Sequence, residues 1–142
     1  MNLKIVELVK EGSCTFASFD GKSYYEASGI GVKPIITPMR ENMEFFKGRE
    51  VADTIIGKAA AMLLVLSGAR AVYGKVMSKA AVEVLTAHGI EFSYGTLVEY
   101  IENRSGDGMC PLEDSVKDEE DIHKAFIKIE KRIEELMKKA HS

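Results

Sequence analysis

A cysteine stands directly before a proline in the segment MCPLED, residues 109–114. Proline suits the first position of a helix, so Cys110 is predicted to be the N-cap and Glu113 the third helical residue. The free N–H groups of such a helix favour a thiolate, whereas the carboxylates of Glu113 and Asp114 oppose it. The segment predicts either a reactive or ligand-binding Cys110 with Glu113 as an acid, base or orienting group, or a partly buried cysteine whose helix is capped by Glu113.

A second group of polar residues lies in VADTIIGKAAAMLLVLSG, residues 51–68. This segment is apolar on every side from residue 55 to residue 66, which predicts one buried helix. Asp53 and Lys58 would then lie in its first turns, near unpaired N–H groups and the positive end of the helix dipole. We expect this helix start and the start of the Cys110 helix to border one cleft.

Lys58 must satisfy its charge in apolar surroundings, because burying an ammonium group is costly unless it finds a partner. It would bind a phosphate or carboxylate, or act as an acid, base or amine nucleophile. The alternative is a structural ion pair with Asp53 or Glu113. Glycine inside a helix costs about 1 kcal/mol relative to alanine, so Gly57 is predicted to allow close approach of a backbone or ligand.

Two further sites are weaker candidates. Gly29 and Gly31, followed by Lys33, are too closely spaced for a dinucleotide motif and form either a plain turn or a ligand-binding loop at the cleft mouth. Arg104 precedes the Cys110 segment and could hold an anion or form an exposed salt bridge.

The first half of the chain alternates short predicted elements with glycine-rich breaks. An amphipathic helix from Leu3 ends at Gly12. CTFASF and KSYYEA flank Asp20-Gly21, which favours a type I′ hairpin turn. After a loop over residues 28–34, Thr37-Pro38 predicts an N-cap and first helical residue, with the helix running to about Phe46.

The second half reads as a β-α-β unit followed by a strand and a helix. A strand in ARAVYGKV (69–76), a helix in KAAVEVLTAH (79–88) capped by Ser78, and a strand in IEFSY (90–94) would be joined by a right-handed parallel crossover. A last strand is predicted in LVEYIEN (97–103). A long helix follows from about residue 118, with a narrow apolar seam at Ile122, Phe126, Ile129, Ile133, Leu136 and Ala140.

This order predicts one three-layer α/β/α domain over residues 1–142, with a mixed sheet of about five strands. The chain has 142 residues, 46% of them hydrophobic, and a net charge of −3, which argues against bulk electrostatic binding of nucleic acid. No apolar run reaches membrane-spanning length, and the first residues do not resemble a signal peptide. Two cysteines make no disulfide framework, so we expect a cytoplasmic protein.

The combination of SGIGVKP, ADTIIGKAAA, the RSGDGMCPLE junction and the length of the tail resembles the family named domain of unknown function 1893. The strand leading into a helix that starts with cysteine and proline, together with an earlier helix with polar first turns, also resembles the cytidine-deaminase-like fold. This resemblance implies a fold and a site neighbourhood, and it carries no established activity.

The sequence departs from true deaminases at the residues that would hold zinc. Those enzymes use an H-x-E motif and a P-C-x-x-C motif, and this chain contains neither. Cys110, Glu113 and Asp53 could supply three ligands, but carboxylate-rich sets suit zinc poorly. No metal and no cofactor are therefore predicted.

Three functions follow as hypotheses. The leading one is a metal-independent enzyme or binder of a small, nucleotide-like molecule, with Asp53, Lys58, Cys110 and Glu113 as catalytic residues and Gly29, Gly31, Lys33, Gly57 and Arg104 as binding residues. The second is a non-catalytic module that assembles with a partner or a second copy through its C-terminal helix. The third is a divergent metal-dependent deaminase.

Overall fold

The fold is taken from a computed structural model, which describes residues 1–141. The elements in chain order are α1 (Leu3–Lys10), β1 (Phe16–Phe19), β2 (Tyr24–Ala27), α2 (Lys33–Glu41), β3 (Glu50–Ile56), α3 (Lys58–Ser67), β4 (Ala71–Ser78), α4 (Lys79–Ala87), β5 (Glu91–Val98), α5 (Pro111–Val116) and α6 (Ile122–His141).

The strands form a five-stranded mixed sheet in the order β2-β1-β3-β4-β5. β1 pairs antiparallel with both β2 and β3, while β3, β4 and β5 run parallel to one another. The parallel strands β4 and β5 are joined by helix α4, so the predicted β-α-β unit is confirmed. Ser78 caps α4 as expected, because its hydroxyl accepts a hydrogen bond from the N–H of Ala81 at 3.2 Å.

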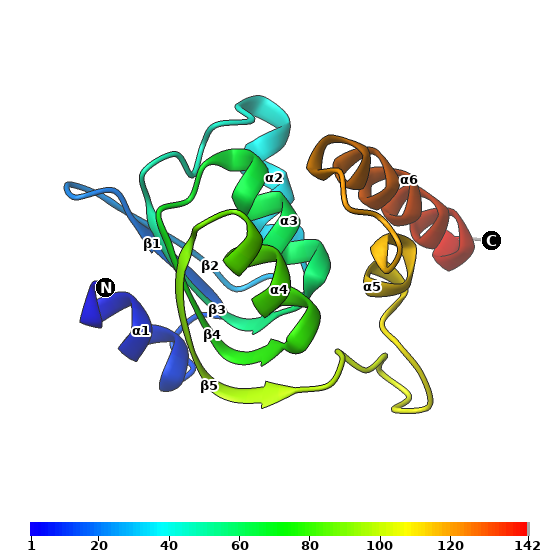
Figure 1. Ribbon diagram of the computed structural model, residues 1–142, viewed down its shortest axis with the longest axis horizontal. Helices are drawn as coiled ribbons and strands as arrows, with labels where there is room; N and C mark the ends of the chain where they lie inside the picture. Colours follow the sequence, from blue (N-terminus) through cyan, green and yellow to red (C-terminus); the bar gives the residue numbers. More distant parts are fainter. Residues whose placement is uncertain (142) are drawn as a thin grey trace.

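Helices cover both faces of the sheet (Figure 1). Helix α1 packs against β1, β3 and β4, where Ile5, Val6 and Val9 bury their side chains. Helices α2, α3 and α4 cover the opposite face and enclose the larger core. Helices α5 and α6 then pack against α3. The predicted three-layer α/β/α arrangement is confirmed.

The prediction of one helix over residues 51–68 is wrong in its first third. Residues Glu50–Ile56 form β3, and the helix begins only at Lys58, with Gly57 as its N-cap. Val51, Thr54, Ile55 and Ile56 are β-branched and favour a strand. A parallel strand covered on both faces has a continuous apolar sequence. The spacing of apolar residues therefore does not distinguish β3 from the buried helix that follows it.

Two other boundaries and one turn also differ from the predictions. Helix α2 starts at Lys33 with Pro34 in its first turn, so Thr37 is not its N-cap, Pro38 lies inside the helix, and the helix ends at Glu41 rather than near Phe46. The hairpin is confirmed, but four residues join its strands, and Gly21 alone of the Asp20-Gly21 pair has positive φ (101°), which excludes type I′.

The strand predicted over residues 97–103 does not form as a separate element. Its first residues extend β5 to Val98, and beyond them a single bridge pairs Glu102 with Met109. The chain between β5 and α5 is otherwise a loop (Figure 1).

The first part of the apolar seam of the C-terminal helix packs against the core. Ala125 and Ile129 of α6 are fully buried in the core that α3 and α5 share with α6. Ile122, Phe126 and Ile133 pack against the same core. The seam from Ile122 to Ile133 therefore docks α6 onto its own chain, whereas Leu136 is half-buried outside this core and Ala140 is exposed.

Candidate functional site

The starts of α3 and α5 meet through the side chain of Glu113, which fills the place where the sequence predicts a cleft. Its Oε1 accepts a hydrogen bond from the N–H of Lys58 at 2.5 Å, and its Oε2 accepts one from the N–H of Ala59 at 2.8 Å. We call these residues, with Gly57, the α3–α5 junction. Glu113 is the third residue of α5, as predicted, but it caps α3 rather than its own helix. A carboxylate here also faces the positive end of the α3 dipole.

Gly57 makes this contact sterically feasible. A Cβ at residue 57 would overlap the carboxylate of Glu113. The close approach predicted for Gly57 is thus made by a side chain of α5. Burial raises the pKa of Glu113, while the two N–H donors and the positive charge of Lys58 act in the opposite direction.

Lys58 is 7% exposed and turns its ammonium group toward the segment that links α5 to α6. Its Nζ donates to the carbonyl of Lys117 at 3.0 Å and lies 3.5 Å from Oε1 of Glu120, an exposed carboxylate. The ion pairs expected with Asp53 or Glu113 do not form within residues 1–141. Sequence reasoning missed Lys117 and Glu120, because a backbone carbonyl and one member of a charged run carry no signal of their own.

Asp53 lies in β3, between Phe16 of β1 and Gly74 of β4 in the strand register. It is 5% exposed, and its Oδ1 accepts a hydrogen bond from the N–H of Thr54 at 2.7 Å. Within the described chain, its Oδ2 has no hydrogen-bond partner. Desolvation raises the pKa of Asp53 to about 8, so the carboxyl group is largely neutral at pH 7.

Cys110 is the N-cap residue of α5, as predicted, with Pro111 in the first position. Its backbone N–H donates to the carbonyl of Ile101 and its carbonyl accepts from the N–H of Asp114, both at 2.9 Å. The thiol is free and half-buried, one helical turn before Glu113.

The glycine loop before α2 connects to the neighbourhood of Asp53 through Thr15. The hydroxyl of Thr15 donates to the carbonyl of Gly29 at 2.6 Å, and the carbonyl of Thr15 accepts from the N–H of Thr54 at 3.0 Å. Gly31 and Lys33 are exposed. Arg104 is exposed in the loop before α5. Of the predicted site residues, Gly57, Lys58 and Glu113 are in direct contact with one another.

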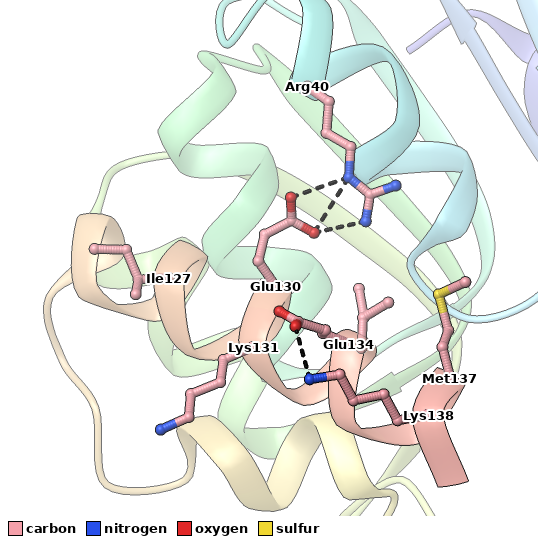
Figure 2. Close-up of a pocket in the computed structure, with 8 residues that line it drawn as sticks. Arg40, Ile127, Glu130, Lys131, Glu134, Met137 and Lys138 are labelled. Atoms are coloured by element: carbon pink, nitrogen blue, oxygen red, sulfur yellow. Dashed lines mark hydrogen bonds and ion pairs between the residues drawn. The ribbon is translucent and has the colours of Figure 1, made fainter. Parts of the chain in front are cut away.

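Two cavities lie elsewhere on the surface. A groove of about 680 Å³ runs between α2 and α6, where Arg40 pairs with Glu130 at 2.6 Å and Ile127 and Met137 are exposed (Figure 2). A smaller hollow of about 400 Å³ is lined by Asn2, Asp20, Glu50 and Arg70, among others. Neither is lined by Asp53, Lys58, Cys110 or Glu113.

The residues present do not fit a zinc site of the deaminase type. Among residues 1–141, no group of three or more His, Cys, Asp or Glu side chains is placed to hold a metal ion. Both carboxylate oxygens of Glu113 already accept hydrogen bonds from α3. No step below therefore depends on zinc.

Comparisons with known proteins agree on a family. The fold is similar to the crystal structure, at 2.70 Å resolution, of a DUF1893 family protein from Thermotoga maritima, with a TM-score of 0.80 and 24% sequence identity over 94% of this chain and 88% of that chain. No protein of curated function matches the chain. Within residues 1–141, no helix is long and apolar enough to cross a membrane. Residues 4–133 match the family described as a domain of unknown function, DUF1893, and the chain belongs to this family.

Proposed function

We propose that the protein binds a small, anion-bearing molecule of nucleotide-like type at the α3–α5 junction, and that Glu113 occupies the anion position in the ligand-free structure. The main support is that the Glu113 carboxylate accepts hydrogen bonds from the backbone N–H groups of Lys58 and Ala59. Backbone N–H groups at a helix start are also a common binding site for phosphate.

Lys58 supports the same proposal. Its side chain is 8% exposed, yet its ammonium group is held by one carbonyl and by Glu120, whose side chain is 88% exposed. An exposed carboxylate at 3.5 Å is a weak partner for a buried cation. A ligand anion that displaced Glu113 would place its charge beside both the helix start and this cation.

The nucleotide-like ligand class is proposed from the resemblance of the sequence to the cytidine-deaminase-like fold. The divergent metal-dependent deaminase lacks a fitting donor set among the described residues. A module that assembles through α6 is the alternative, and the surface open to it is the groove in Figure 2, because most of the seam packs against the core and only Ile133 of it also lines the groove.

Substitution of Glu113 tests the proposal. Glu113→Ala leaves two buried N–H groups without their acceptor, which we expect to cost about 1–3 kcal/mol of the free energy of unfolding. Inorganic phosphate, or a nucleoside monophosphate, should then raise the melting temperature of Glu113→Ala by clearly more than it raises the melting temperature of wild type. Sodium chloride at equal ionic strength controls for general salt effects.

Two matched variants locate the effect. Glu113→Gln keeps an acceptor oxygen at the junction, so it should gain little response to phosphate. Glu113→Ala combined with Lys58→Met should lose the response, because the cation is gone. A phosphate response in Glu113→Ala no larger than in wild type would contradict the proposal.

A further inference from the structure

Strand β5 forms one edge of the sheet and is open to solvent along its length (Figure 1). Six of its eight residues are exposed, and Phe92 and Val98 are half-buried. Glu91 is its only charged residue, so Phe92–Val98 presents seven uncharged residues on a free edge. Natural proteins normally protect such an edge with charges, prolines or very short strands.

The opposite edge shows this protection. Strand β2 has four residues and carries Glu26 in its middle. Strand β5 is twice as long as β2 and lacks such protection, which indicates that another strand pairs with β5 when the protein functions.

The sheet face beside β5 is also open. Val51 and Ile56 of β3 both enter the core under α2–α4, although they are five residues apart. Val72 and Met77 of β4 do the same. In a regular strand, side chains five residues apart point to opposite faces of the sheet. The alternation must therefore slip by one residue between Val51 and Ile56 in β3, and between Val72 and Met77 in β4.

The shift turns a row of side chains away from the core. Ile55, Val76 and Thr96 are paired across β3, β4 and β5. Ile55 is 47% exposed, Val76 is half-buried and Thr96 is exposed. Tyr94 and Leu97 of β5 are 42% and 38% exposed, and Leu97, which pairs with the core residue Met77, points to the side of the sheet opposite to Thr96.

We propose that β5 pairs with β5 of a second copy of this chain, antiparallel about a two-fold axis, so that the rows Ile55–Val76–Thr96 of the two copies meet on one face of a continuous sheet. A closed two-fold contact needs a self-complementary surface. Antiparallel pairing of an uncharged strand with itself places no like charges opposite each other along residues 92–98.

The charges at the ends of the strand fit the same geometry. Lys79 and Glu99 form an ion pair at 2.5 Å at the end of β5, and Glu91 stands at its start. Antiparallel pairing brings the start of one β5 next to the end of the other. Each Glu91 then lies next to the Lys79–Glu99 ion pair of the second copy, so the charged side chains stand only at the two ends of the paired strands.

Matched lysine substitutions on full-length protein test this interface. Thr96→Lys places a charge on both the edge and the open row, whereas Ile127→Lys places the same charge on the 67% exposed Ile127 of the α6 groove. Sedimentation equilibrium should show a dimer for wild type, an unchanged dimer for Ile127→Lys, and a dissociation constant raised about tenfold or more for Thr96→Lys.

Three results would overturn the inference. They are a wild type that stays monomeric up to submillimolar concentration, a dimer that Thr96→Lys leaves intact, and a dimer that Ile127→Lys weakens instead. If Thr96→Lys fails to fold, hydrogen exchange of wild type decides: the β5 amides should exchange more slowly as protein concentration rises. Exchange at β5 that is independent of concentration would refute the pairing.

Discussion

The environment of Asp53 favours the neutral, protonated form of its carboxyl group. Its Oδ2 lacks a hydrogen-bond partner within the described residues, and only the N–H groups of the following residues favour its charged form. Burial dominates and raises the pKa from 3.8 to about 8. The folded protein therefore holds a proton at this position that the unfolded chain releases near pH 4.

This difference predicts a pH dependence of stability. Between about pH 4 and pH 8 the folded state binds more protons than the unfolded state, so the free energy of unfolding should fall as pH rises, by roughly 1 kcal/mol for each pH unit. Asp53→Asn removes the titrating group and should remove this part of the slope. Urea unfolding of both proteins at several pH values measures it.

The comparison must be made between the two proteins, because burial also raises the pKa of Glu113 and contributes in the same direction in both. Parallel curves for wild type and Asp53→Asn over this range would show that Asp53 is ionised in the fold.

At the scale of elements, the sequence predicted most helices and strands from their periodicity and caps. Ser78 and the Cys110-Pro111 pair mark helix starts with side chains, and the structure has both. The sequence does not mark the boundary between β3 and α3, because the glycine that separates them, Gly57, is also compatible with the interior of a helix. A buried parallel strand followed by a buried helix gives one uninterrupted apolar run.

The site was predictable only in part for a related reason. Lys58, Gly57 and Glu113 stood out as residue types in unusual surroundings, and the structure brings them together. Their arrangement depends on how α5 docks onto α3, a contact between segments more than fifty residues apart. Local patterns do not encode such a contact, so the role of Glu113 as a cap for another helix was not foreseen.

Two isoleucines of α6 test how this helix is held. Ile129 is fully buried against the core, whereas Ile127, two residues earlier, is 67% exposed. Ile129→Ala should cost about 2–5 kcal/mol of the free energy of unfolding, because it leaves a cavity between α6 and the core. Ile127→Ala should change it by about 0.5 kcal/mol or less. Equal losses for the two variants would show that α6 does not dock as described.

At the scale of the whole molecule, α5 and α6 form an outer cover over α3 (Figure 1). The Glu113 carboxylate and the Lys117 carbonyl both belong to this cover, and both accept hydrogen bonds from Lys58 at the start of α3. A movement of α5 and α6 away from α3 would therefore break both contacts together. Under the proposed function, ligand binding at the junction would therefore be coupled to the docking of residues 111–141 onto α3.

The backbone N–H groups of Lys58 and Ala59 report on this site directly. Nuclear magnetic resonance can follow both amides while phosphate is titrated into wild type and into Glu113→Ala. The proposed function predicts large, saturable shifts of these two amides in Glu113→Ala and small shifts in wild type, where Glu113 holds the position. Amides that respond to phosphate no more in Glu113→Ala than in wild type would contradict an anion site at the start of α3.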